Sequence, residues 1–553
     1  MNSFRLMFAS RRLALTAVMA LSVVLAGLGF VNVWFLVPLP VTLGLSLLGL
    51  RDIAQRNHSI LRNYPILAHI RFILEKIRPE IRQYFLESEN DGAPFSRKKR
   101  SVVYQRAKGQ LDKLPFGTLL DVYGDAFEWV HHSIAPAEPA REAFRVTVGG
   151  PQCSQPYSAS VFNISAMSFG ALSANAITAL NRGARFGRFA HDTGEGGISK
   201  YHREGGDIIW EIGSGYFGCR TSDGKFSELD FITNAADPAV KMIEIKLSQG
   251  AKPGQGGVLP GAKVSAEISA ARGVPPGKEC ISPSRHSAFS TPTGLLQFVD
   301  KLRKLSGGKP VGFKLCVGHP WEFLAICKAM VATDILPDFI VVDGTEGGTG
   351  AAPLEFTDHI GMPLREGLTF VHNALVGINK RDHIRIGASG KITSAFDLAR
   401  AMALGADWCN SARGFMFALG CIQSLSCHTD KCPTGVATQD KDRQKALYVP
   451  DKATRVAQFH RSTVKVLTEV VAAAGIDHPS QFRLHHFFRR TSAGIMTYAE
   501  LYHPLAPGEL LSGTEDIRFK TPWAMAQADT FAPATVTPER SAPLGKEPVV
   551  VGR

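Results

Sequence analysis

The strongest constraint on the fold is a series of short apolar runs that end in glycine or a small polar residue and alternate with stretches of helical spacing. This alternation is typical of parallel β/α units. Eight such runs predict an α/β protein built as a (β/α)8 TIM barrel, whose chemistry lies on the loops after the strand ends. A doubly wound sheet is the alternative, because the third and fourth runs are the weakest. The predicted strands are 163–169, 189–193, 242–247, 280–283, 311–317, 339–343, 384–387 and 408–412.

The amino-terminal region is apolar enough to enter a membrane. From Leu13 to Leu50 the sequence contains no Asp, Glu, Lys, Arg or His, and one spanning helix needs about 20 apolar residues. We predict a transmembrane helical hairpin in residues 1–55, with spans near 13–30 and 34–50. A cleaved signal peptide is the alternative, but the run is long and no small-residue cleavage site ends it. Arginines flank the hairpin on both sides, which places both ends and the catalytic domain on the cytoplasmic side of the cytoplasmic membrane.

The rest of the chain divides into three predicted parts. Residues 56–135 combine an amphipathic helical pattern with a charged loop and are expected to form a helical connector. Residues 136–520 are expected to form the barrel, and residues 521–553, rich in Pro and Thr, a disordered tail. The net charge is +13, but no basic tract is interleaved with aromatic residues, so we expect no nucleic-acid partner. A basic surface suits anionic lipid or an acidic electron carrier instead.

Three of the nine cysteines, Cys421, Cys427 and Cys432, fall within one short segment, and a proline follows the last of them. Soft thiolates gathered on a loop are what an iron–sulfur cluster needs. Structural zinc with His428 as fourth ligand, or unrelated thiols, are the alternatives. Adjacent Cys427 and His428 are awkward as two ligands of one ion, which disfavours zinc. Because no fourth cysteine is evident, the segment favours a three-iron cluster, on a loop at 421–432.

Two loops near the end of the predicted barrel suit a phosphate group. Residues 387–391 follow the seventh predicted strand and precede a helix, so their amides and the helix N-terminus can hold an anion. Residues 411–414 follow the eighth predicted strand, and Arg413 adds positive charge. These positions are the usual phosphate site of such barrels. An ordinary tight turn is the alternative for each loop taken alone.

Charged side chains stand where a substrate or a flavin ring can meet them. Lys314 lies inside an apolar strand, where a charge is costly unless it has a role, and it can stabilise negative charge on a reduced flavin. A lysine on a strand edge is the alternative. Glu195 lies on a glycine-rich loop and can orient substrate or relay a proton, although a solvated loop residue is the simpler interpretation. Gln249 and Lys252 can contact a ring edge or a dicarboxylate.

Several of these segments occur together in the order of one family: SAMSFGALS (165–173), TGEGG (193–197), QGAKPGQGG (249–257), the Lys314 strand, GGTG (347–350) and the cysteine segment that ends in PTGVATQ (433–439). With them, residues 72–502 resemble the FMN-binding synthase domain of glutamate synthase, in particular stand-alone glutamate synthase-like proteins that carry an N-terminal membrane segment.

The resemblance implies a barrel that holds FMN and a [3Fe-4S] cluster bound by Cys421, Cys427 and Cys432. It also implies an oxidoreductase that forms glutamate from 2-oxoglutarate and ammonia, by hydride transfer from reduced FMN to an imine, with electrons arriving through the cluster. Lys314 would be an electrostatic stabiliser, and Glu195, Gln249 and Lys252 would lie on the substrate side. The residues implied around FMN are Ser165, Ala166, Met167, Ser168, Gln249, Lys314, Ser389, Gly390, Arg413 and Gly414.

The sequence also departs from full-length glutamate synthases. No cysteine precedes Cys153, so glutamine hydrolysis is expected to be absent or to come from another subunit. No dinucleotide-binding fold is recognised, so ferredoxin, a separate reductase or a membrane quinone is the expected electron donor. Ala352 stands where the family has serine, which leaves the substrate open. The alternatives are a membrane-linked N-methylglutamate synthase-like or amino-acid/amine oxidoreductase and, from another class, a non-catalytic FMN/Fe-S electron-transfer subunit.

Overall fold

The computed structural model describes residues 10–535. The chain separates into two compact units, Met1–Arg97 and Lys98–Arg553, and each is described by itself. The predicted connector, 56–135, is therefore not one element. Its first part belongs to the N-terminal unit, whereas residues 98–135 pack on the barrel, for example through the hydrogen bond from the Tyr104 hydroxyl to the Cys421 carbonyl oxygen at 2.6 Å.

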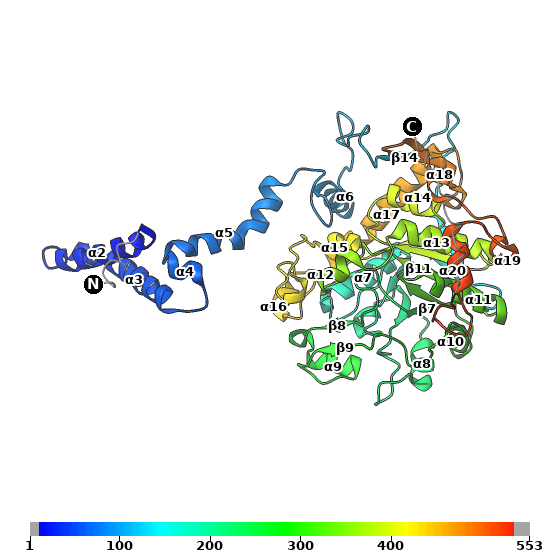
Figure 1. Ribbon diagram of the computed structural model, residues 1–553, viewed down its shortest axis with the longest axis horizontal. Coiled ribbons are helices and arrows are strands. Elements are labelled where there is room, and N and C mark those ends of the chain that lie inside the picture. The colour runs from blue at the N-terminus through cyan, green and yellow to red at the C-terminus, as the bar shows by residue number, and fades with distance from the viewer. Residues whose placement is uncertain (1–9, 536–553) are drawn as a thin grey trace, which may run out of the picture. The chain divides into compact units, whose positions relative to one another are not determined.

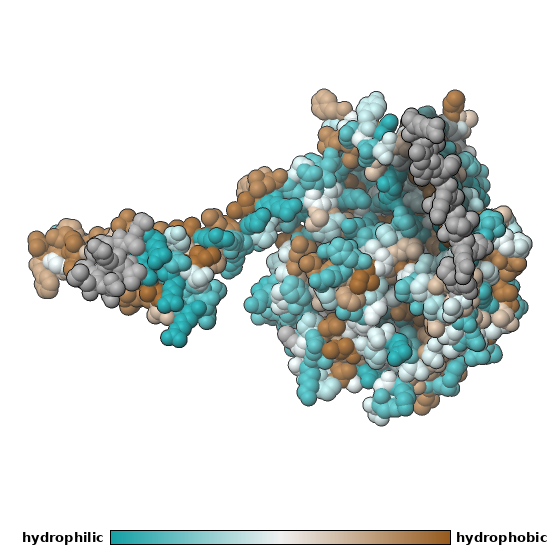
Figure 2. Space-filling view, in the orientation of Figure 1, coloured by the Kyte–Doolittle hydropathy of each residue, from teal (hydrophilic) through white to brown (hydrophobic). Residues whose placement is uncertain are grey.

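The N-terminal unit contains two apolar helices, α2 (Leu13–Leu28) and α3 (Leu39–Ala54), which pack against each other. The helical segment Val33–Ala54 is long and apolar enough to cross a membrane by length and composition, and α2 is also apolar but shorter. Figure 2 shows apolar side chains gathered on the surface of this unit. The pair of helices matches the predicted hairpin in shape, while its place in a membrane stays a prediction.

Two further helices follow in the same unit, α4 (Ser59–Asn63) and α5 (Leu67–Ile81), and α5 continues into a π-helical turn, Arg82–Leu86. The buried carboxylate of Asp52 in α3 fixes the start of α5, because it pairs with His69 Nε2 at 2.9 Å and accepts a hydrogen bond from the Ile66 amide at 3.1 Å.

The second unit is a closed barrel of eight parallel strands (Figure 1), which confirms the predicted fold. Its strands, in the order in which they neighbour one another, are β4 (Phe162–Ile164), β5 (Ala190–Asp192), β6 (Asp207–Ile212), β7 (Val240–Lys246), β10 (Val311–Leu315), β11 (Phe339–Asp343), β12 (Arg385–Ser389) and β13 (Trp408–Ser411). The helices around them include α7 (Ala174–Gly187), α8 (Glu228–Ala235), α10 (Pro292–Leu305), α11 (Pro320–Thr333), α13 (Leu364–Gly377), α14 (Ala395–Ala403), α15 (Arg413–Leu419) and α17 (Val449–Ala473).

One predicted strand is wrong and one strand was missed. Residues 280–283 do not enter the barrel: Cys280–Ile281 forms β9, which pairs antiparallel with β8 (Val258–Leu259) in an insert between β7 and α10. The missing barrel strand is β6, which carries the buried Glu211. Only a 3-10 turn, Lys200–His202, and no α-helix separates β6 from β5, so β6 does not follow the strand–helix alternation on which the prediction rested.

Apolar side chains fill the end of the barrel at which the strands begin, which we call the lower end. A hairpin of β2 (Arg145–Val148) and β3 (Tyr157–Ser160) precedes β4. Buried residues of this hairpin and of several barrel strands form one cluster, which leaves the opposite end, where the strands finish, for polar loops. The cluster consists of Val148, Tyr157, Ala159, Ala190, Ile209, Met242, Phe339, Val341 and Trp408.

The C-terminal region is more ordered than predicted. The strand pair β14 (Phe487–Thr491) and β15 (Gly494–Thr497) forms a small sheet with β1 (Glu128–Val130). Helix α20 (Ile517–Met525) buries Phe519, and the carbonyl oxygen of Ala528 accepts a hydrogen bond from Thr293 Oγ1 at 2.8 Å. The predicted disorder is therefore wrong for 521–528, and residues 536–553 lie outside the described part. The remaining helices of this unit are α6 (Arg97–Ala107), α9 (Ala266–Arg272), α12 (Leu354–His359), α16 (Lys441–Lys445), α18 (Tyr498–Tyr502) and α19 (Glu509–Ser512).

Candidate active site

Lys314 points into the barrel, not along a strand edge. Its ammonium forms ion pairs with Glu211 of β6 and, at 3.0 Å, with Glu244 Oε1 of β7, and Asp192 Oδ2 of β5 lies 3.9 Å away. All four side chains are at most 4% exposed. The three carboxylates lie within 4.8 Å of one another, but the Lys314 ammonium already occupies the space between them. The group is therefore an ionic cluster with more acids than bases.

The excess of acids means that this cluster holds protons at neutral pH. Burial raises the pKa of Glu244 to about 7, with Glu211 adding to the shift and Lys314 opposing it. Burial and the nearby Glu244 raise the pKa of Asp192 as well. For Lys314, burial opposes the charged form, yet the surrounding carboxylates raise its pKa above the ordinary value. Lys314 stays charged, and Asp192 and Glu244 are the acids whose raised pKa values favour their protonated forms.

Glu195 lies beside a second group of cations, two of which, Lys246 and Arg272, were not predicted. Lys246 Nζ, at the end of β7, is 3.0 Å from Glu195 Oε2 and donates to Gln249 Oε1 at 2.9 Å. Burial alone would raise the pKa of Glu195, but Lys246, Arg272 and Lys252 lower it. The structure thus brings the predicted Glu195, Gln249 and Lys252 together and adds Lys246 and Arg272. A buried strand with Glu and Lys at alternate positions was the signal that could have revealed Lys246.

Glycines allow the loops at the mouth to approach one another closely. A Cβ atom on Gly257 would lie 1.9 Å from Glu195 Oε1, and one on Gly250 would lie 1.8 Å from the carbonyl oxygen of Gly344. Any larger residue would push these loops apart. Gly250 and Gly257 of the QGAKPGQGG segment therefore allow close contacts at the barrel mouth.

The loop after β4 meets the loops after β12 and β13. The Ser165 amide donates to the Ser411 carbonyl at 3.1 Å, and the hydroxyls of Ser165 and Ser389 are 3.4 Å apart. Met167 is buried and its amide donates to the Asp192 carbonyl at 3.4 Å, whereas Ala166 is half-buried. Arg272 Nη2 donates to Ser168 Oγ at 3.3 Å. The loop that carries Ser165, Met167 and Ser168 thus contacts both loops assigned to the phosphate, through Ser389 and Ser411.

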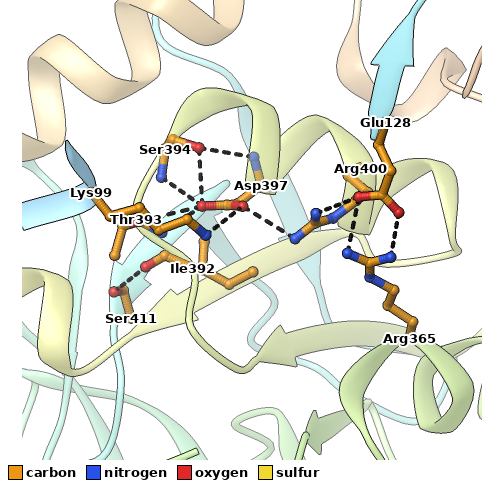
Figure 3. A network of polar contacts seen from close by, with 9 residues as sticks. All are labelled: Lys99, Glu128, Arg365, Ile392, Thr393, Ser394, Asp397, Arg400 and Ser411. Atoms are coloured by element: carbon orange, nitrogen blue, oxygen red, sulfur yellow. Dashed lines mark hydrogen bonds and ion pairs between the residues drawn. The ribbon is translucent and has the colours of Figure 1, made fainter. Parts of the chain in front are cut away.

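Part of the predicted phosphate site has a different form. The two amides just before α14 are not open to an anion, because Asp397 accepts hydrogen bonds from the Thr393 and Ser394 amides, each at 3.1 Å (Figure 3). The loop at Gly390 and the start of α15 remain. There Arg413 donates to the Glu346 carbonyl at 2.8 Å, and burial lowers its pKa to about 10. A half-buried guanidinium at the start of α15 fits a phosphate.

A cavity of about 240 Å³ adjoins this loop, and its lining includes Lys99, Glu346, Gly390 and Lys391. Glu128 of β1 holds one wall of this cavity in place. Its carboxylate pairs with Arg365 through both oxygens and with Arg400 Nη1 at 2.9 Å (Figure 3). Glu128 belongs to the segment predicted as a mere connector. That segment therefore helps to build the barrel's upper rim.

The three clustered cysteines lie together after α15, and like all nine cysteines they form no disulfide. Burial raises the pKa of Cys421 to about 12, and the nearby Cys427 and Cys432 thiols add to the rise. For Cys432, burial acts the same way but is outweighed by hydrogen bonds from Thr434 and from the amides at 434, 436 and 437, so its pKa is lowered. Among the described residues, the three sulfurs do not form a set within 4.8 Å of one another, the spacing that a single ion needs. Three thiols on one loop, one of them in a setting that favours its thiolate, suit an iron–sulfur cluster.

The comparisons with known proteins agree with this geometry. The model of the conserved region in glutamate synthase matches residues 148–477. The glutamate synthase large subunit-like protein YerD of Bacillus subtilis is 38% identical over 82% of this chain and 94% of that protein. Archaeal glutamate synthase (NADPH) of Methanocaldococcus jannaschii is 38% identical over 58% of this chain and 60% of that protein, and the archaeal-type enzyme of Thermotoga neapolitana is 36% identical over 56% and 59%.

This chain is also similar to a solved structure of the flavin-binding domain of baker's yeast flavocytochrome b2. The match covers 73% of this chain and 81% of the yeast chain, with 13% identity and a TM-score of 0.39. The family model and the Bacillus subtilis relative establish the family, because their matches span the barrel, its mouth and the cysteine loop. This chain is an oxidoreductase of the glutamate synthase family.

Proposed function

We propose that this protein is a membrane-anchored glutamate synthase that reduces the imine formed from 2-oxoglutarate and an amine, using FMN and a [3Fe-4S] cluster. The observation that carries the proposal is the barrel mouth, where Glu195 and its cations face loops suited to a flavin, above the Lys314 cluster. The family relationship supports the reaction class, and the geometry supports the roles of the residues.

The cations around Glu195 suit a dicarboxylate substrate. Lys246, Lys252 and Arg272 supply positive charge that one carboxylate does not fully neutralise. Burial, and to a lesser degree Lys246, lowers the pKa of Lys252, so a second carboxylate from the substrate would favour its charged form. Glu195 has a lowered pKa and is ionised, so it can accept a proton from an amine that attacks the 2-oxo carbon.

The residues at the barrel mouth fit FMN. When bound, FMN supplies the hydride that reduces an imine. Ser165, Met167, Ser389, Gly390, Arg413 and Gly414 would hold it, with Arg413 and the loop amides at its phosphate. The Lys314 cluster lies on the inner side of the mouth and holds an ammonium and shared protons in place, so negative charge that develops nearby is stabilised without rearrangement of water.

The cysteine loop fits an iron–sulfur cluster that delivers electrons one at a time. Cys421, Cys427 and Cys432 would bind it, and Tyr104 and the amides at 434–437 hold their loop in place. The archaeal-type relatives are named for NADPH, but this chain spans only 60% and 59% of them. We propose that a ferredoxin or a separate reductase donates electrons to this chain.

The N-terminal helices would anchor the enzyme. We propose that α2 and α3 form a membrane hairpin with the barrel on the cytoplasmic side, because the stretch from Leu13 to Leu50 lacks charges and is flanked by arginines. An anchor of this kind would keep the enzyme near a membrane-bound electron source.

The proposal is tested with detergent-purified protein under anaerobic conditions. Visible and EPR spectra report flavin and cluster, and 2-oxoglutarate is then supplied with ammonia, methylamine or glutamine and an artificial reductant. Glutamate formed from ammonia supports the main proposal. N-methylglutamate formed from methylamine in preference would change the amine donor, and flavin and cluster signals without any product would identify an electron-transfer subunit instead.

A further inference from the structure

One buried lysine of the second unit lies next to the cysteine loop and has no role in the site described above. Lys263 ends a short 3-10 helix, Gly261–Lys263, in the insert between β7 and α10, and it is 3% exposed. Its ammonium donates to the carbonyl oxygen of Ala171 at 3.2 Å and to that of Ala437 at 3.1 Å. Burying an ammonium is costly, so a compensating negative group is expected near Lys263.

The two carbonyl partners come from two functional loops. Ala171 follows the Ser165–Ser168 loop at the flavin surface, and Ala437 follows Cys432 in the cysteine loop. A second contact joins the same loops, because Gln439 Nε2 donates to the carbonyl oxygens of Gly170 at 3.1 Å and Leu172 at 2.9 Å. Lys263 therefore lies where the two loops meet.

The charges near Lys263 are those of the cysteine loop. Burial lowers the pKa of Lys263, and Asp430, Cys427 and Cys432 act in the opposite direction. Asp430 is itself fixed, since its carboxylate accepts the Gln439 amide at 2.7 Å. A buried cation, Lys263, thus lies beside the cysteine loop, and an anion, Asp430, lies on the loop two residues before Cys432.

We propose that Lys263 is a positioning residue that raises the reduction potential of the iron–sulfur cluster, and that Asp430 opposes it; this inference rests on the cluster proposed above. Reduction adds one electron from the external donor to the cluster and makes no bond, so the site gains one negative charge. A buried positive charge nearby favours the reduced form, and a negative charge disfavours it. The lysine would thus help the cluster to accept electrons before they pass to the flavin loop.

The test is a redox titration of the full-length protein in detergent, followed by EPR. Lys263→Gln keeps N–H donors for the two carbonyls but removes the charge, and we expect the ratio of reduced to oxidised cluster at a fixed potential to fall on the order of tenfold, about 59 mV for one electron. Lys263→Arg should titrate close to the natural protein. Lys278→Gln, at an exposed lysine of the same insert, is the matched control and should leave the midpoint unchanged.

A midpoint in Lys263→Gln equal to that of the natural protein, or a fall of the same size in Lys278→Gln, would overturn the inference. If Lys263→Gln does not retain iron, Asp430→Asn decides: a higher midpoint supports the inference and an unchanged one overturns it. A natural protein without any cluster signal would instead overturn the proposed cluster and this inference with it, which is a different result from an unchanged midpoint.

Discussion

Two adjacent layers inside the barrel have opposite character. Ala190, Ile209 and Met242 belong to the apolar cluster at the lower end. Two residues further along the same strands lie Asp192, Glu211 and Glu244, which surround Lys314. Because side chains two positions apart in a strand face the same side, both layers point inward. The lower layer stabilises the fold by apolar burial, and the upper layer places charge in a buried position that only a function explains.

The difference means that stability and activity should respond to different substitutions. A gap in the lower layer loses packing but touches no reacting group. A change in the upper layer alters the charge beneath the proposed flavin, and it also leaves buried charges without partners.

The largest effect is expected from Lys314→Met. This substitution leaves the carboxylates of Asp192, Glu211 and Glu244 without their cation, and we expect glutamate formation to fall by about 10³-fold, the scale for loss of one preorganised electrostatic group. Turnover per bound flavin measures it. Lys304→Met, at an exposed helical lysine, is the control. Activity of Lys314→Met within about threefold of that of the natural protein would show that the ionic cluster around Lys314 has no part in the reaction.

Trp408→Ala tests the lower layer. Trp408 is 1% exposed, and truncation of a buried tryptophan typically costs about 3–5 kcal/mol of stability. We expect a clearly lower Tm with nearly unchanged turnover per bound flavin in protein that remains folded. A loss of turnover as large as that of Lys314→Met, without a lower Tm, would contradict the separation of the two layers.

Glu195→Gln tests the proton acceptor at the rim. The amide keeps the size of the side chain and can still accept from Lys246, but it cannot take a proton from the amine, so we expect a fall of about 10²-fold in kcat. Steady-state kinetics with 2-oxoglutarate and ammonia measure it. Glu355→Gln, at an exposed acid, should have no effect. A change confined to KM would assign Glu195 to substrate binding alone.

The smallest effect concerns pH and stability. The pKa of Glu244 rises from 4.5 to about 7 in the folded protein, so between these values the folded state holds a proton that the unfolded chain has released. Its contribution to stability is complete below pH 4.5 and is lost as the pH rises through 7. We expect Tm to fall less over this range in Glu244→Gln than in the natural protein. Parallel Tm curves would contradict the shared-proton account.

Much of this organisation was visible in the sequence. The strand–helix alternation predicted the barrel, and the spacing of Cys421, Cys427 and Cys432 marked their loop, because both signals are local. Strand β6 was missed because only a 3-10 turn separates it from β5, so it does not follow the strand–helix alternation. The pairing of Glu128 with Arg365 and Arg400 joins segments far apart in the chain, so no local pattern could predict it, and Lys246 was hidden in a strand interpreted only for its apolar residues.

The central claim, that the barrel mouth brings a flavin together with an imine, is tested most directly by one anaerobic measurement. The purified protein is reduced, mixed rapidly with 2-oxoglutarate, ammonia or both, and followed by its visible spectrum. The account predicts that reduced flavin is reoxidised quickly only when both substrates are present, with glutamate formed in equal amount. Absence of flavin, or reoxidation at the same rate without the substrates, would contradict it.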